Sequence, residues 1–359
     1  ERESAMKSMG DAMKKISAYV KNEGGSIEGV REGASAISQA SHKIVPNLFP
    51  AATGIGNIED SEAKPEIWQQ WGRFEQAADR LVEAGFNAID TADIYSHWAP
   101  GHSGGESENV IGKWLKQRGK RDDVLILTKV GGEMPGQGKG LGRAWIKKEV
   151  EHSLKRLHTD HIDLYQSHFD DPDTPLAETM GAYAELIAEG KVRAIGASNY
   201  SAARLREALT AAAELGVPRY ESLQPHYNLM EREGFEKELQ PLCYEEGIGV
   251  ITYFSLAAGF LTGKYRSEED LGQSPRGNGV KKYLNPRGLA VLRALDEVST
   301  RHGVTQAQVA IAWLANRGGV TAPIASATKL EQLEDLLKAA TLKLSAEDMA
   351  ALDEASAPA

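Results

Sequence analysis

Four polar side chains that suit proton transfer lie at the ends of apolar runs that predict β-strands. They are Asp90, Tyr95, Lys129 and His168. Lys129 comes directly after the apolar run VLILT, so we expect it to be buried, and a buried ammonium is costly unless it is paired. Asp90 ends the preceding predicted strand and is the neighbouring carboxylate. The structural alternative is a plain ion pair beside a rim tyrosine and a core histidine.

The combination of an ammonium, a phenol and an imidazole favours one kind of chemistry. A nearby ammonium stabilises phenolate, so Tyr95 beside Lys129 can pass a proton to a developing alkoxide near neutral pH. His168 can hold a carbonyl oxygen by hydrogen bonding. Together these groups predict the addition of a hydride to a carbonyl.

Seven apolar runs must position these side chains. They cover residues 86–95, 124–131, 162–169, 192–199, 220–228, 249–256 and 320–328. Their lack of strict polar alternation is typical of parallel strands covered by helices, and amphipathic helical stretches separate them. Strand–helix units of this kind join by right-handed crossovers, and seven of them favour an α/β fold of the (β/α)8 TIM barrel type over an open sheet. A barrel places the carboxyl ends of its strands on the face where active sites form.

The expected barrel is one strand short of eight. Residues 1–80 contain no convincing strand and show helical periodicity, with a helix predicted over 65–85 between Pro65 and the cap residue Gly85. Residues 46–57, which include LFPAATGIG, are the best candidate for the eighth strand. Without that strand, unpaired edges would remain and would invite association into a homo-oligomer.

The composition argues against several classes of protein. The 359 residues contain 41 Lys and Arg against 51 Asp and Glu, and the net charge of -10 argues against nucleic acid as the main partner. No run of about 18 apolar residues occurs, which argues against a membrane protein. The lone Cys243 excludes an intramolecular disulfide, a cysteine-built zinc site and a CxxCH haem attachment. The charged first residues lack the apolar stretch of a signal peptide, so we expect a cytoplasmic protein. We also expect no bound metal.

The segments around these side chains resemble the motifs of the aldo-keto reductase family. The resemblance covers about residues 82–359 and rests on AIDTADIYSHWAPGHSGGESENVIG, LILTKVGG, IDLYQSHF, RAIGASNYS, ESLQPHYNLMERE and GFLTGKYRSEEDLGQSPRG. It implies a TIM barrel that reduces a small aldehyde or ketone with NADPH. By motif position it also implies Tyr95 as the general acid, Lys129 and Asp90 as the residues that tune it, and His168 as the residue that orients the carbonyl.

The same resemblance implies how the nicotinamide end of the cofactor is held. Ser198, Asn199 and Gln224 would bind the carboxamide, and Tyr253 would stack on the nicotinamide ring. Taken alone, Tyr253 would be interpreted as a core aromatic residue.

Two further segments would hold the phosphates and the adenosine. Phosphates need cations or aimed backbone N–H groups. The loop 255–266 is glycine-bearing and carries two cations, and a third follows in SPRG; the residues implied here are Ser255, Leu256, Gly259, Lys264, Arg266 and Arg276. The motif ASATKLEQLEDLL (325–337) follows the last predicted strand and opens the last helix, which Thr328 can cap. The residues implied there are Thr328, Lys329, Gln332 and Asp335. A solvated charged loop is the alternative for the cations.

Residues 1–80 resemble a different family, the first part of a cytochrome c prime four-helix bundle. The haem-attachment cysteines of that family are absent, so no haem is expected. The chain therefore looks composite, with a helical segment over 1–80 and a barrel over 81–359. Three hypotheses remain open: a working reductase in which residues 46–57 supply the strand, a non-catalytic or engineered composite, and a haem-binding module.

Overall fold

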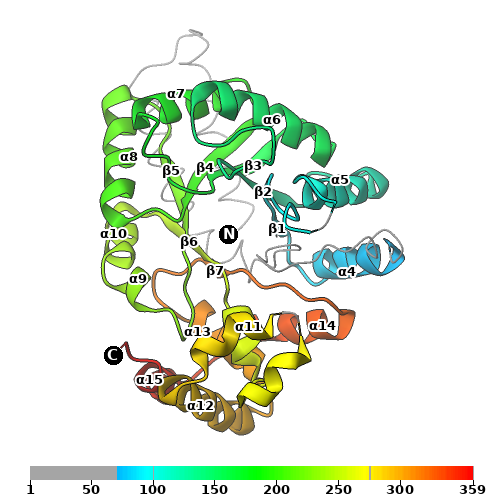
Figure 1. Cartoon of the computed structure of the whole chain (residues 1–359), viewed down its shortest axis with the longest axis vertical. Coiled ribbons are helices and arrows are strands. Elements are labelled where there is room, and N and C mark those ends of the chain that lie inside the picture. Colours follow the sequence, from blue (N-terminus) through cyan, green and yellow to red (C-terminus); the bar gives the residue numbers. More distant parts are fainter. Residues whose placement is uncertain (1–70, 100, 275, 359) are drawn as a thin grey trace, which may run out of the picture. The chain divides into compact units, whose positions relative to one another are not determined.

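A seven-stranded parallel sheet forms the centre of the protein. The computed structural model describes residues 71–359 except 100, 275 and 359. The strands pair in chain order, and all neighbours run parallel. They are β1 (Ala88–Asp90), β2 (Leu125–Val130), β3 (Ile162–Ser167), β4 (Val192–Ser198), β5 (Tyr220–Gln224), β6 (Gly249–Thr252) and β7 (Ala322–Pro323). Figure 1 shows the strands curling around a centre. All seven predicted strands are confirmed.

Helices follow the strands and cover the outside of the curled sheet (Figure 1). The longer ones are α4 (Trp71–Glu83), α5 (Glu106–Arg118), α6 (Arg143–Leu157), α7 (Leu176–Ala188), α8 (Ala202–Leu215), α10 (Leu239–Glu246), α12 (Pro286–His302), α13 (Gln306–Ala315), α14 (Leu330–Ala339) and α15 (Ala346–Ala355). Short helical turns are α9 (Glu233–Glu236), η1 (Ala257–Thr262), η2 (Glu268–Gln273), α11 (Gly277–Val280) and η3 (Lys281–Tyr283). The alternation of strand and helix is the barrel-type α/β fold that the sequence predicts.

The two ends of the sheet, β1 and β7, are linked through their helices. Helix α4 precedes β1, and α14 follows β7. Leu81 of α4 and Leu333 of α14 share one buried cluster, and Arg80 forms an exposed ion pair with Glu334 at 2.6 Å. The outer ring of helices therefore continues from α14 to α4, although β1 and β7 form no ladder with each other in the described residues. The proposed eighth strand, residues 46–57, lies outside those residues.

The end of α4 follows its sequence signals. Gly85 has a φ of +91°, a conformation that glycine adopts at little cost, and its N–H donates to the carbonyl of Val82 at 2.9 Å. The predicted end of this helix is thus confirmed. Pro65, its predicted start, lies outside the described residues.

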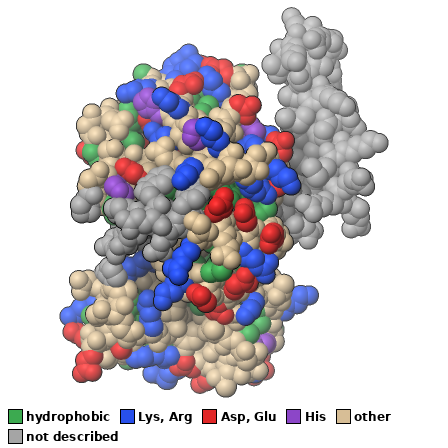
Figure 2. All heavy atoms as spheres, turned by 90° about the vertical axis from the view of Figure 1, so that its right-hand side faces the viewer, with side chains coloured by type: hydrophobic (Ala, Val, Ile, Leu, Met, Phe, Trp, Pro, Cys, Tyr) green, Lys and Arg blue, Asp and Glu red, His purple; other side chains and the backbone are tan. Residues whose placement is uncertain are grey.

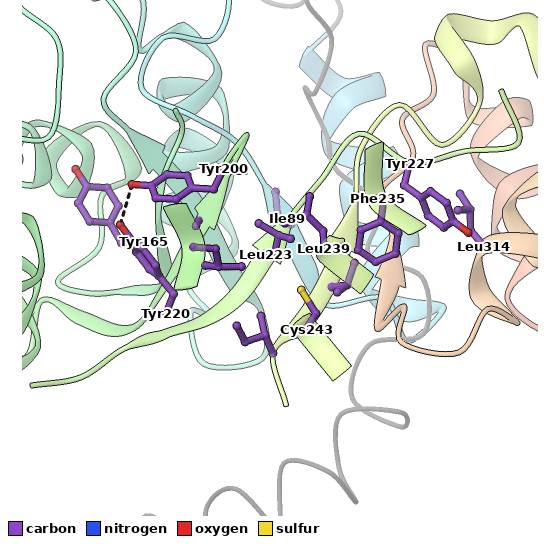
Figure 3. Close-up of a cluster of buried hydrophobic side chains, with 14 of the residues drawn as sticks. Ile89, Tyr165, Tyr200, Tyr220, Leu223, Tyr227, Phe235, Leu239, Cys243 and Leu314 are labelled. Carbon is purple, nitrogen blue, oxygen red and sulfur yellow. Dashed lines mark hydrogen bonds between the residues drawn. The ribbon is translucent and has the colours of Figure 1, made fainter. Parts of the chain in front are cut away.

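A group of buried tyrosines fills one side of the core (Figure 3). Ser167 at the end of β3 contacts the hydroxyls of Tyr183 at 2.8 Å and Tyr220 at 2.6 Å, and Tyr200 reaches Tyr220 at 3.3 Å. These bonds satisfy phenol groups that would otherwise be buried without partners. These contacts therefore fix the carboxyl end of β3, which His168 follows directly.

Three observations bear on the classes of protein considered above. Among the described residues, no helix combines the length and apolar character needed to cross a bilayer. Cys243 in α10 is free and buried, and burial raises the pKa of its thiol to about 12, which keeps it protonated and unreactive. Figure 2 shows basic and acidic side chains intermixed on one face of the molecule.

Two helical glycines provide a matched test of the packing. A Cβ at Gly112 in α5 would lie 2.0 Å from the backbone oxygen of Arg156, whereas one at Gly181 in α7 would meet nothing within 4 Å. We expect Gly112→Ala to lower the free energy of unfolding in urea. Gly181→Ala should raise it by about 1 kcal/mol, the helix-propensity difference. Equal effects of the two substitutions would contradict the close α5–α6 contact.

Candidate functional site

A fully buried lysine forms the centre of the site. Lys129 on β2 places its Nζ 2.6 Å from Asp90 Oδ2, 2.9 Å from the carbonyl oxygen of Thr91 and 2.9 Å from the hydroxyl of Tyr95. The side chains of Lys129 and Asp90 have no solvent exposure. Burial lowers the pKa of Lys129, and the Asp90 carboxylate opposes that shift. The structure thus brings three of the predicted residues into direct contact.

The second oxygen of Asp90 accepts hydrogen bonds from two amides. Gln224 Nε2 donates at 2.8 Å and Gln166 Nε2 at 3.3 Å, so side chains of β1, β2, β3 and β5 meet here. Gln224 was predicted to bind a cofactor carboxamide, whereas its amide nitrogen in this structure contacts Asp90. Gln166 was missed by the sequence analysis. Its signal was a glutamine inside an apolar strand, two residues before His168 and hence on the same face.

His168 and Tyr95 lie side by side in a nearly closed environment. Tyr95 is 5% exposed and His168 7%, and their rings meet edge to face with centroids 5.7 Å apart. Phe169 stacks on His168 at 4.5 Å and remains 40% exposed. Burial, assisted by the charge of Lys129, lowers the pKa of His168 well below its ordinary value, so its imidazole is neutral. His168 Nδ1 is buried and has no hydrogen-bond partner among the described residues.

Three residues predicted to hold a nicotinamide lie at the carboxyl ends of strands β4 and β6. Asn199 follows β4 and donates to the carbonyl of His168 at 2.9 Å, while Tyr253 follows β6 and donates to Asn199 Oδ1 at 2.8 Å. Ser198 Oγ donates to the carbonyl of Gln224 at 2.8 Å. Asn199 has a φ of +57°, a left-handed conformation that asparagine tolerates better than most residues. This chain of bonds joins the ends of β3, β4, β5 and β6.

The predicted phosphate loop has an unusual backbone. Ser255 Oγ donates to the carbonyl of Ile324 at 2.6 Å and ties this loop to the end of β7. Ala257, Ala258 and Gly259 follow with φ values of +48°, +55° and +94°. Alanine rarely adopts such values, and backbone strain of this kind concentrates at ligand-binding loops. Leu256 packs against the small buried cluster beneath α14.

The cations of this region differ in their contacts. Lys264 is exposed and its Nζ lies 4.9 Å from the ring centroid of Tyr265. Arg266 forms two bonds of 2.8 Å to Asp296, so its charge is already paired. Arg276 stands at the N-terminal cap of α11. Of these three, Lys264 is the cation most accessible to a ligand.

The start of α14 corrects one expectation. Lys329, not Thr328, occupies the N-terminal cap position, and no side chain caps this helix. Thr328 instead donates from its backbone N–H and its hydroxyl to Gln332 Oε1, both at 3.0 Å, because the helix begins one residue later than predicted. Asp335 accepts bonds from Thr305 at 2.7 Å and Gln308 at 2.8 Å on α13.

A second buried acid, missed by the sequence analysis, lies in the turn that carries Tyr95. Asp93 is fully buried; its Oδ1 accepts the N–H of Ile94 at 2.7 Å, and Oδ2 has no hydrogen-bond partner among the described residues. Burial raises the pKa of Asp93 well above its ordinary value; nearby Glu108 and Glu149 add to the rise and Arg156 opposes it. This carboxyl therefore favours its protonated form.

The raised pKa of Asp93 predicts a pH-dependent effect on stability. The folded protein binds this proton more tightly than the unfolded chain, so the stability contribution is complete below the unfolded pKa and is lost as pH rises. Asp93→Asn keeps the acceptor for Ile94 and removes the titration. We expect it to raise the Tm by ~2–4 °C near pH 8 and to leave it unchanged near pH 4. The exposed control Asp122→Asn should show no such trend, and a Tm for Asp93→Asn that falls with pH relative to wild type would refute the assignment.

The central ion pair predicts a double-mutant pattern in urea denaturation. Lys129→Met leaves the Asp90 carboxylate buried without its cation and should cost about 3–5 kcal/mol of unfolding free energy. Adding Asp90→Asn removes that charge, so the double variant should regain a large part of the loss. If the losses measured for Lys129→Met alone and Asp90→Asn alone add up to the loss in the double variant, the two side chains are not coupled.

Comparison with known proteins agrees with the geometry. Residues 73–357 match the aldo/keto reductase family, and residues 1–94 match cytochrome C', so the two matches overlap over 73–94. Aldo-keto reductase YhdN of Bacillus subtilis is 36% identical over 273 residues, covering 74% of this chain and 78% of that protein. L-glyceraldehyde 3-phosphate reductase of Escherichia coli O157:H7 is 33% identical over 302 residues, covering 80% and 86%. The predicted resemblances are confirmed for both parts of the chain. The chain is an oxidoreductase of the barrel type and belongs to the aldo-keto reductase family.

Proposed function

We propose that this protein reduces an aldehyde or ketone to an alcohol with NADPH, with Tyr95 as the proton donor. The observation that carries the proposal is the position of Lys129 Nζ, which contacts both the Tyr95 hydroxyl and the Asp90 carboxylate and is fully buried. An ammonium beside a phenol stabilises the phenolate that remains after proton transfer. A plain structural ion pair would not need the phenol at hydrogen-bond distance.

The residues present fit a nicotinamide dinucleotide. Tyr253 offers a half-buried aromatic ring after β6, and its hydroxyl donates to Asn199, whose amide in turn contacts Ser198 and the carbonyl of His168. The left-handed run over 257–259 and the exposed Lys264 suit a phosphate. When bound, NADPH would supply the hydride. The preference for NADPH over NADH rests on the family resemblance.

The chain's own side chains account for the proton transfer. The neutral His168 imidazole donates a hydrogen bond to the carbonyl oxygen and so orients and polarises it. The Tyr95 hydroxyl gives its proton to that oxygen as negative charge develops there. Lys129 stabilises the resulting phenolate, and Asp90, held by Gln166 and Gln224, keeps the ammonium in place. Water then returns the proton to Tyr95.

Two further proposals concern the whole chain. We propose that the cytochrome-like segment ends before α4 rather than at residue 80, because α4 packs on α14 of the barrel, and that the protein works in the cytoplasm. The free, buried Cys243 agrees with a reducing compartment. The packing of α4 on α14 supports the catalytic hypothesis over a non-catalytic composite, because it continues the helical ring beside β1.

Turnover of a generic aldehyde tests the proposal. We expect Tyr95→Phe to lower NADPH-linked reduction by about 10²- to 10⁴-fold, because the proton donor is lost, while NADPH still quenches protein fluorescence on binding. The matched control is Tyr244→Phe, since Tyr244 is 82% exposed on α10, and it should retain wild-type turnover. Equal loss of turnover and of NADPH binding in Tyr95→Phe would refute the general-acid role. No binding by the wild type at near-millimolar NADPH would refute the reductase itself.

A further inference from the structure

One aromatic pair behind the proposed nicotinamide site is not part of the proton-transfer group. His226 follows β5 and Tyr253 follows β6, and their backbones form a parallel bridge. Their rings stack with centroids 5.1 Å apart and an angle of 17° between planes. The imidazole therefore covers one face of the Tyr253 ring, and the Phe254 ring meets Tyr253 edge to face with centroids 5.3 Å apart.

The turn that carries Tyr253 is strained and is held by the same neighbours. Phe254 has a φ of +53°, which is a rare conformation for a bulky residue. Asn228 Nδ2 donates to the carbonyl of Phe254 at 2.9 Å, and the His226 ring meets the Phe254 ring at 5.3 Å. Asn228 Nδ2 also lies 3.3 Å from His226 Nε2. Asn228 therefore holds the backbone directly after Tyr253, while the His226 ring packs against the rings of Tyr253 and Phe254.

The surroundings of His226 suit a neutral, rigid ring. Burial lowers the pKa of His226, with Glu231 opposing this shift and Lys282 adding to it. His226 also lines a cavity of about 670 Å³, which Tyr253 does not line. Removing the imidazole would open space beside Tyr253 and let its ring tilt away from Asn199.

We propose that His226 is a positioning residue that supports Tyr253 from behind and so fixes the ring on which the nicotinamide stacks. The inference rests on the proposed function, because it requires Tyr253 to contact the nicotinamide. It assigns His226 no part in the chemical step. His226 acts through the orientation of the Tyr253 ring and through the hydrogen bond from the Tyr253 hydroxyl to Asn199.

Two ligands separate this role from a general structural one. NADPH carries the nicotinamide, whereas adenosine 2′,5′-bisphosphate carries the adenosine phosphates alone. We expect His226→Ala to weaken NADPH binding about 3- to 10-fold, as loss of an aromatic contact does, and to leave binding of the bisphosphate unchanged. His226→Phe restores a flat ring and should bind NADPH as the wild type does. Both are measured by titration, with the Tm as a check on folding.

The outcomes are distinct. Equal weakening of both ligands by His226→Ala, or NADPH binding unchanged from the wild type, would overturn the inference. Failure of the wild type to bind NADPH would instead overturn the proposed function. If His226→Ala does not fold, His226→Phe is compared with His226→Leu, because only the phenylalanine keeps a flat ring. Equal NADPH affinity in these two variants would also overturn the inference.

Discussion

The positive charge of Lys129 is the constraint on which the site depends. An ammonium without solvent exposure is stable only when a carboxylate and further acceptors surround it, and here Asp90, the Thr91 carbonyl and the Tyr95 hydroxyl do so. Asp90 in turn requires the amide of Gln224 from β5. The ends of separate parallel strands must therefore converge, and the curled sheet is the architecture that brings them together.

Much of the fold and the centre of the site could be predicted, because both follow from local pattern. Apolar runs mark the seven strands, and Asp90, Lys129 and His168 stand where parallel strands end. Gln166 and Asp93 could not be placed in the same way, since their importance comes from partners on other strands and helices. The cap at Thr328 was wrong because a shift of one residue in a turn leaves no trace in composition.

Helix α4 lies where the two family matches of this composite chain overlap. This helix falls in the stretch matched by both families, yet it packs against α14 of the barrel. It therefore serves the barrel, whichever family its sequence resembles more. The site also draws on two different parts of the fold. The sheet positions Lys129 and Asp90 beside Tyr95, the proposed proton donor, while the loop after β6, with Phe254, Ala257 and Ala258 at positive φ, carries the groups proposed to hold a nucleotide.

Transfer of label from the cofactor tests the central claim most directly. NADPH carrying deuterium at the transferable position of the nicotinamide would be incubated with the protein and an aldehyde, and the alcohol analysed by mass spectrometry. Hydride addition followed by protonation of oxygen predicts one deuterium on the former carbonyl carbon and an exchangeable proton on oxygen. An alcohol without deuterium on that carbon, or no alcohol at all, would contradict the account.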